Sequence, residues 1–88
     1  YDVRSNRESG RGRYDLAAIP QQQSQPGFLL EFKTAASKEE LEAKAQEALD
    51  QMETKDYLAD FRTRGVEDVH RYGIAFCGKK VQVAYQRP

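Results

Sequence analysis

Three charged residues lie within stretches that otherwise predict β-strands, where a charge is costly unless it is paired. Glu31 and Lys33 are two residues apart in the apolar stretch 28–33 and therefore share one face of a strand. Asp15 lies in the preceding strand-like stretch, so it can lie beside Glu31 if the two strands pair. Two adjacent carboxylates repel each other unless a cation joins them. Because oxygen ligands suit Mg²⁺ or Mn²⁺ and a nearby lysine can hold a phosphate, the three residues predict metal-assisted hydrolysis of a phosphodiester.

The strands that must position these residues follow from the hydrophobic pattern. Alternating or continuously apolar stretches predict five strands, at residues 1–6, 13–19, 28–33, 69–77 and 81–85. Two glycines, at positions 10 and 12, predict a turn over residues 7–12, and residues 21–27 form a polar loop that ends in Pro-Gly. A tight turn at Gly78 and Lys79 joins the last two strands.

One long helical segment is predicted between the third and fourth strands. Ser37 and Glu40 have the spacing of a capping box. An apolar stripe follows, formed by Leu41, Ala45, Ala48, Leu49 and Met52. Its phase shifts near residues 54–56, after which Tyr57, Leu58 and Phe61 form the apolar side of a continuation that Gly65 ends. The order β-β-β-α-β-β predicts an α/β fold, a mixed β-sheet with one long helix on one face.

Length and composition fit one small globular domain. The 88 residues are 39% hydrophobic and 32% charged, and 14 basic and 14 acidic residues give a net charge of zero. This balance excludes binding of nucleic acid by bulk positive charge. The charges are nevertheless segregated, because residues 38–62 carry four basic and eight acidic groups whereas both ends of the chain are basic.

The cellular setting is suggested by features that the sequence lacks. No apolar run approaches the length of a membrane span, and no signal peptide is visible. Cys77 is alone, which excludes an internal disulfide and argues against a structural zinc site. We therefore expect a cytoplasmic protein with no membrane partner. Because the chain begins with Tyr1 rather than Met, we expect it to be a segment of a longer protein.

An Asp on one strand followed by Glu-X-Lys on the next resembles the active site of the PD-(D/E)XK nuclease superfamily. The residues here are Asp15, then Glu31, Phe32 and Lys33. The flanking segments 5–15 and 72–79, with the acidic helix between them, resemble one bacterial subfamily whose members carry this domain C-terminal to an AAA-ATPase-like domain. The resemblance covers nearly the whole chain, so residues 1–88 are interpreted as a single nuclease-like domain.

The resemblance implies a restriction-endonuclease-like core and DNA cleavage that depends on Mg²⁺ or Mn²⁺. It implies that Asp15, Glu31 and the backbone carbonyl of Phe32 hold the metal. Lys33 would then position or activate the attacking water and stabilise charge on the phosphate. The superfamily's core begins with a helix that this sequence lacks, and the superfamily's proline is Tyr14 here. Without that first helix one face of the sheet is exposed, so we expect a homodimer or an adjoining domain to cover it.

Further residues are candidates for supporting roles. Gln51 and Tyr57 resemble a Gln–Tyr pair that some nucleases of the superfamily carry on this helix, although a spacing of six places them about 120° off one helical face. Gln51 is a candidate accessory residue, whereas Tyr57 is assigned to the core. Four basic residues near turns, Arg11, Arg13, Lys79 and Lys80, are candidates for contacts with DNA phosphates. Pairing of Arg13 with Glu31, and simple solubility for the two lysines, are the alternative explanations.

Two other functions are compatible with the same residues. The domain could keep a nuclease fold without turnover and act as a binding or accessory module of an ATPase-like protein. The zero net charge, the acidic helix and the missing first helix favour this alternative. The domain could also mediate protein–protein contacts, with Glu31 and Lys33 forming only a salt bridge, in which case apolar replacements of the pair would leave the fold intact.

Overall fold

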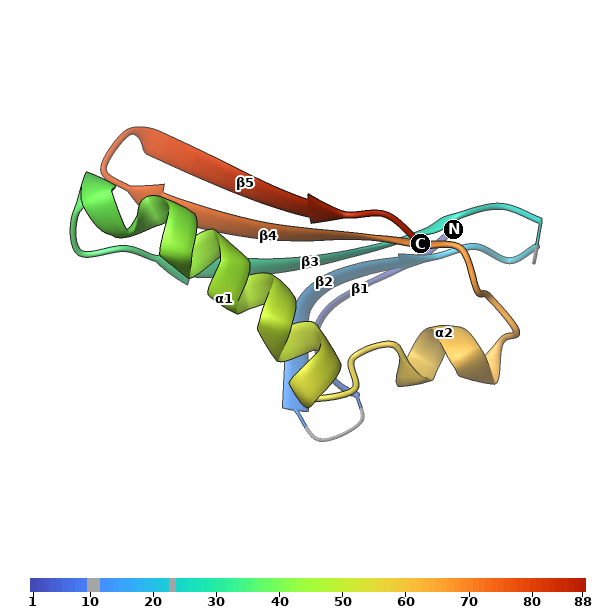
Figure 1. Ribbon diagram of the computed structural model, residues 1–88. Helices are drawn as coiled ribbons and strands as arrows, with labels where there is room; N and C mark the ends of the chain where they lie inside the picture. Colours follow the sequence, from blue (N-terminus) through green and yellow to red (C-terminus); the bar gives the residue numbers. More distant parts are fainter. Residues whose placement is uncertain (10–11, 23) are drawn as a thin grey trace.

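The architecture is a five-stranded mixed sheet with two helices on one face (Figure 1). The computed structural model describes residues 1–9, 12–22 and 24–88, and side chains for all of these except residues 6–9 and 12–14. The strands are β1 (Asp2–Ser9), β2 (Gly12–Ile19), β3 (Gly27–Thr34), β4 (Val69–Cys77) and β5 (Lys80–Gln86). The helices are a 3₁₀ turn over Lys38–Glu40, α1 (Leu41–Thr54) and α2 (Ala59–Thr63). The predicted mixed sheet and its element order are confirmed.

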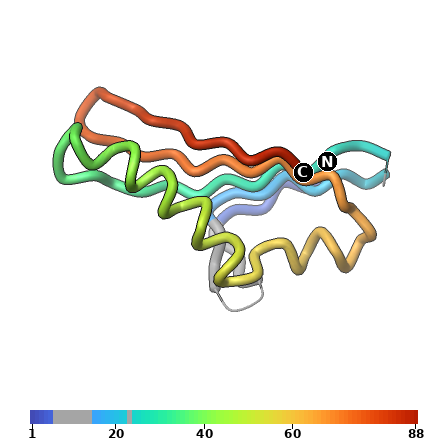
Figure 2. The backbone as a smooth tube through the Cα atoms, viewed as in Figure 1, coloured from blue at the N-terminus to red at the C-terminus, as the bar shows by residue number. Residues whose placement is uncertain are grey.

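The strands lie in the sheet in the same order as in the chain, β1-β2-β3-β4-β5. Three neighbouring pairs are antiparallel, and β3 pairs with β4 in parallel over eight residues. A parallel pair requires a crossover connection, which α1 and α2 provide (Figure 2). The first hairpin is longer than predicted, because Arg7 pairs with Tyr14 and Ser9 with Gly12, so the predicted turn over residues 7–12 is wrong at both ends.

The start of the helical segment differs from the predicted capping box. Ser37 has the extended backbone of an N-cap residue, but its side chain makes no capping hydrogen bond. The Glu40 carboxylate instead accepts the backbone N–H of Ala36, at 3.2 Å, and the Glu40 N–H donates to the Ser37 carbonyl. Because the chain enters through a 3₁₀ turn, Glu40 reaches back one residue further than in a capping box.

The predicted phase shift after residue 54 marks a break between two helices. Asp56 adopts a left-handed conformation with φ of 55°, which ends α1 and redirects the chain. The turn brings Tyr57 and Phe61 into the core, where both side chains are buried. Gly65, also at positive φ, follows α2 as predicted. No helix in the described part of the chain is long and apolar enough to cross a membrane.

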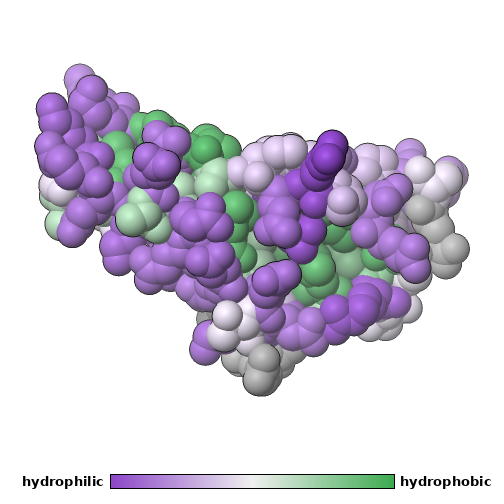
Figure 3. Space-filling model, viewed as in Figure 1, coloured by the Kyte–Doolittle hydropathy of each residue, from purple (hydrophilic) through white to green (hydrophobic). Residues whose placement is uncertain are grey.

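The core lies between the sheet and the two helices. Its larger cluster joins the sheet residues Leu29 and Val69 to Leu49, Met52 and Phe61 on the helices. A smaller cluster lies near the beginning of α1, and the free thiol of Cys77 packs against it. This single cysteine therefore behaves as a partly buried small hydrophobe. The described side chains on the side of α1 that faces away from the sheet are largely hydrophilic (Figure 3).

Two strand glycines allow the helices to approach the sheet closely. A Cβ atom on Gly73 of β4 would lie 2.1 Å from the Ala45 carbonyl oxygen of α1. A Cβ atom on Gly27 of β3 would lie 2.6 Å from the Phe61 ring of α2. Both helices therefore rest on the same face of the sheet, and larger residues at these positions would push them away.

Candidate active site

The site begins where β2 separates from β3. Only three pairs join these strands in the described residues, from Ala18 with Phe28 to Leu16 with Leu30. The β1–β2 hairpin continues beyond this point and curves toward the C-terminal end of α1 (Figure 1). The separation leaves backbone groups of β3 without a strand partner on that side, immediately beside Asp15 and Glu31.

The Asp15 side chain takes the place of the missing strand pairing. Its Oδ2 atom accepts the backbone N–H of Phe32 at 2.6 Å. In an extended strand the N–H and C=O of one residue point to the same side, so the carbonyl of Phe32 is directed toward the same gap. The gap therefore combines a carboxylate from β2 with a backbone oxygen from β3.

Glu31 contributes a second carboxyl group and is the only buried charged residue among the described side chains. It is 4% exposed and lies on the helix-facing side of β3, opposite Gly73 of β4. Burial raises the pKa of Glu31 to about 8, and the adjacent Asp15 carboxyl adds to the rise, while the ammonium group of Lys33 acts in the opposite direction. The two carboxyl groups thus lie beside each other as predicted, in an environment that resists a second negative charge.

Lys33 is directed from β3 toward α1. Its Nζ atom donates to Oε1 of Gln51 at 2.5 Å. Gln51 in turn donates from Nε2 to the Tyr57 hydroxyl at 2.8 Å. In one continuous helix Gln51 and Tyr57 would point in different directions around the helix axis. The chain instead turns at the left-handed residue Asp56, which brings the two side chains together. Tyr57 is 1% exposed, so it is a core residue as predicted and also a hydrogen-bond partner of Gln51.

Gly73 connects this geometry to the packing of the fold. Glu31 pairs with Gly73 in the β3–β4 register, and α1 lies directly above Gly73. The missing side chain at position 73 lets the helix approach, and this approach brings Gln51 within reach of Lys33. Sequence periodicity places Gln51 on α1, but it carries no information on how closely α1 packs on the sheet.

Of the four basic residues predicted to contact DNA, the structure describes the side chains of two, Lys79 and Lys80, and these lie away from the site. Arg11 lies outside the described residues, and so does the side chain of Arg13. Lys79 and Lys80 are exposed at the β4–β5 turn, at the end of the sheet where α1 begins (Figure 1). Gln51 lies near the opposite end of α1, so the two lysines could contact only a substrate that extends well beyond the carboxylates.

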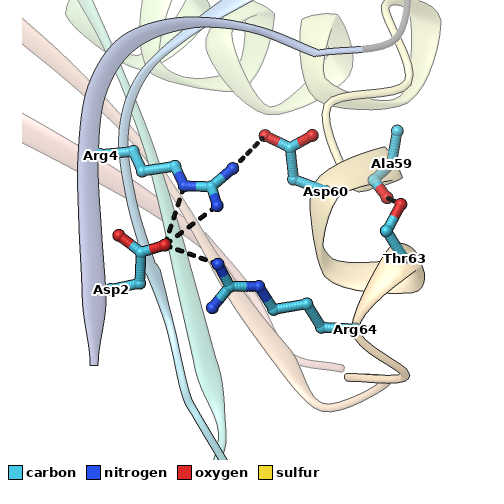
Figure 4. A network of polar contacts seen from close by, with 6 residues as sticks. All are labelled: Asp2, Arg4, Ala59, Asp60, Thr63 and Arg64. Atoms are coloured by element: carbon cyan, nitrogen blue, oxygen red, sulfur yellow. Dashed lines mark hydrogen bonds and ion pairs between the residues drawn. The ribbon is translucent and has the colours of Figure 1, made fainter.

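A polar network that the sequence analysis missed fixes the first strand to α2 (Figure 4). Oδ2 of Asp2 accepts hydrogen bonds from Arg4 at 3.0 Å and from Arg64 at 2.7 Å, and Arg4 also contacts Asp60 at 3.4 Å. These hydrogen bonds, first that from Arg4 and then that from Arg64, lower the pKa of Asp2. The partners are up to 62 residues apart in the chain, so no local pattern could reveal them.

The oxygen atoms of Asp15, Glu31 and the Phe32 carbonyl fit a small divalent cation. Among the described residues no group of three His, Cys, Asp or Glu side chains converges on one point. The available protein ligands are instead two carboxylates and one carbonyl, all oxygen donors. Mg²⁺ accepts such a set because it keeps several water ligands and needs only one or two carboxylates from the protein. A cation there would also relieve the repulsion between Asp15 and Glu31.

Comparison with known proteins agrees with this geometry. Residues 1–86 match a family model described as the PD-(D/E)XK nuclease superfamily. Searches of curated proteins and of solved structures found no match. The family model covers all five strands and both helices, including the residues of the candidate site. The chain therefore belongs to the PD-(D/E)XK nuclease superfamily.

Proposed function

We propose that this chain is a nuclease domain that hydrolyses DNA phosphodiester bonds with Mg²⁺ or Mn²⁺. Members of the superfamily generally use divalent metals. The observation that carries the proposal is the meeting of Asp15, Glu31 and Lys33 at the point where β2 leaves β3. The resemblance also supports a place for this domain in a longer bacterial protein, C-terminal to an AAA-ATPase-like domain.

In this proposal Asp15, Glu31 and the Phe32 carbonyl hold the cation. A bound cation would supply Lewis acidity toward the phosphate and lower the pKa of the attacking water. Glu31 would lose its proton when the cation binds, because the cation offsets the burial and the repulsion from Asp15 that raise its pKa. Asp15 would keep its position through the N–H of Phe32.

Lys33 has the role of holding the phosphate and stabilising the charge that develops on it. Its Nζ atom has three protons, and one of them is engaged by Gln51. Two remain for the phosphate or for the attacking water. The hydrogen bonds from Lys33 through Gln51 to Tyr57 reduce the freedom of the ammonium group, so its position is defined before substrate binds.

The proposal is tested by incubating labelled single- and double-stranded DNA with the protein and Mg²⁺ or Mn²⁺. Replacing Lys33 by Ala or Asp15 by Asn should reduce cleavage by at least about a hundredfold, the usual scale for loss of one such group. Lys44→Ala is the matched control, because Lys44 lies on α1 and its ion pair within the described residues is with the exposed Glu47. Cleavage that survives both site substitutions would refute the assignment.

A non-catalytic accessory function is separated from the nuclease by two measurements on the same protein. Calorimetric titration with Mg²⁺ or Mn²⁺ reports whether Asp15 and Glu31 hold a cation. A protein that binds the cation but cleaves no DNA, alone or with its ATPase-like neighbour, would be an accessory module. Failure to bind any cation up to millimolar concentrations would contradict the metal site itself.

A further inference from the structure

Asp15 lies on the β1–β2 hairpin, which is joined to the rest of the sheet over a short stretch. In the described residues three register pairs join β2 to β3, and all of them follow Asp15 in the chain. Before them, the Phe32 N–H donates to Oδ2 of Asp15. The angle between neighbouring strands varies from about −10° to about −35° among sheets. Three pairs alone therefore do not fix where Asp15 lies relative to Glu31.

The hairpin has a second attachment, which joins β1 to α2 and is called the hairpin anchor below (Figure 4). Oδ2 of Asp2 accepts a hydrogen bond at 2.7 Å from Arg64, the residue that follows α2. Arg4 contacts Asp60 of α2 at 3.4 Å, and it also bonds to Asp2, so the two contacts form one network. The four side chains are between 23% and 35% exposed. Ion pairs that are partly shielded from water are stronger than fully exposed ones.

The hairpin anchor lies close to Asp15 along the hairpin. Arg4 pairs with Ala17 in the register of β1 and β2, and Ala17 is two residues from Asp15. Two residues span about 7 Å of a strand and return to the same face of the sheet. β1 also lies about 4.8 Å farther from β3 than β2 does. The anchor therefore holds the hairpin away from the line of β2–β3 pairs, and it resists rotation of the hairpin about that line.

The segment that carries the anchor on the helix side also supports the other side of the site. Tyr57 lies three residues before Asp60 and accepts a hydrogen bond from Gln51. Gln51 in turn accepts the hydrogen bond from Lys33. Because Tyr57 is buried, the beginning of this segment is fixed in the core. Residues 57–64 are thus connected to Lys33 on one side and to the β1–β2 hairpin on the other.

We propose that the hairpin anchor positions Asp15, so that Asp2, Arg4, Asp60 and Arg64 are positioning residues of the candidate site. The anchor sets the angle at which the hairpin leaves the sheet, and this angle sets where the Asp15 carboxyl group lies. A role of the anchor in cation binding rests on the proposed function. The placement of Asp15 against the backbone of β3 does not, because it is a property of the folded chain without a cation.

The test measures hydrogen exchange in a chelator at the Phe32 amide, which Asp15 protects while the hairpin keeps its position. Arg64→Met keeps an unbranched side chain but removes the N–H donors. It should speed this exchange at least about tenfold relative to the Leu49 amide in the middle of α1, the usual scale for losing a hydrogen bond between charged groups. Arg64→Lys keeps a donor and should retain most of the protection.

Arg62→Met is the matched control, because Arg62 lies on α2, loses the same charge and forms its ion pair with Asp56 of the same segment. It should leave exchange at Phe32 unchanged relative to Leu49. If Arg64→Met does not fold, Asp60→Asn replaces it, since it weakens the other contact of the anchor and keeps the size of the side chain. Equal acceleration at the two amides, or no acceleration at Phe32, would overturn the proposal.

Calorimetric titration with Mn²⁺ separates this proposal from the proposed function. Loss of a positive charge alone strengthens the attraction of a cation, whereas a displaced Asp15 binds it less well. Arg64→Met should therefore bind Mn²⁺ at least about fivefold more weakly than Arg62→Met. A wild-type chain that binds no Mn²⁺ but shows the exchange difference would refute the metal site and support the anchor. Tighter binding by Arg64→Met, without an exchange difference, would overturn the anchor and leave the metal site supported.

Discussion

Replacing Glu31 by Gln should stabilise the cation-free protein, and the gain should grow as the pH rises. The pKa of Glu31 is about 8 in the folded protein and 4.5 in an exposed reference state. The folded state therefore binds more protons than the unfolded state between these values, and the free energy of unfolding falls with pH across this window. The contribution is fully present below pH 4.5 and is lost as the pH passes through about 8.

The size of the effect follows from the two pKa values. Each pH unit in the window costs about 1.4 kcal/mol, so the loss reaches about 3 kcal/mol at pH 7 and about 5 kcal/mol above pH 8. A chain of this length has a total stability of only about 4–13 kcal/mol. The cation-free protein should therefore be marginally stable in mild alkali, whereas the uncharged amide of the Glu31→Gln variant carries no such penalty.

Urea denaturation in a chelator at half-unit steps from pH 5 to pH 9 measures this difference. The other titrating groups are shared by both proteins, so the difference between wild type and Glu31→Gln isolates residue 31. Asp15→Asn is an informative control, because Asn keeps an oxygen for the Phe32 N–H but removes the neighbouring charge, and it should recover part of the loss. A difference that is constant from pH 5 to pH 9, or a Glu31→Gln protein less stable at pH 8, would refute the reasoning.

Three further substitutions test the supports of the site. Gly73→Ala should cost at least about 2 kcal/mol in urea denaturation, because its Cβ atom would collide with the Ala45 carbonyl, and relief of the clash must move α1. Tyr57→Phe removes the hydroxyl that holds Gln51, so it should lower the free energy of unfolding by about 1 kcal/mol. It should also reduce DNA cleavage, with little change in the cation affinity measured by calorimetry. Unchanged cleavage would show that this hydroxyl does not matter. Asp56→Ala should be about 1 kcal/mol less stable than Asp56→Gly in thermal or urea melts, because of these two residues only Gly adopts a φ of 55° without strain. Equal losses of stability in the two variants would contradict this account of the helix break.

The strands were predictable because the information that specifies them is local. Alternation and apolar runs predict β4 with its observed ends at residues 69 and 77 and predict β3 to within one residue at each end. The first hairpin was predicted less well. Its two glycines indicate a turn, but the pairing of Arg7 with Tyr14 is a property of two strands together and has no signature in either one.

The helical segment shows the same limit more sharply. The stripe from Leu41 to Met52 predicts α1 and its buried face. The shift in phase near Asp56 is visible in the sequence, but a left-handed residue is held there by the packing of Tyr57 in the core. Periodicity alone therefore could not distinguish a bent helix from two helices.

The placement of the two carboxylates of the candidate site could be predicted from the sequence, whereas the hydrogen bond and the packing that position Lys33 could not. Strand order and alternation bring Asp15 next to Glu31, and burial, together with this neighbour, raises the pKa of Glu31. The hydrogen bond from Lys33 to Gln51 depends on how closely α1 approaches the sheet. That approach is set by a glycine forty residues beyond the motif, so it appears only when the chain is folded.

The separation of β2 from β3 has a mechanical consequence. Asp15 and Glu31 belong to two parts of the sheet that no strand pair joins at their level in the described structure. The hairpin is anchored at its other end, where Asp2 accepts a hydrogen bond from Arg64 and Arg4 contacts Asp60. A cation shared by the two carboxylates would therefore cross-link the hairpin to the rest of the sheet, with a stabilisation that rises with the logarithm of cation concentration. Hydrogen exchange at the Phe32 amide would then slow as the site fills, so the form prepared for catalysis would also be the most rigid one.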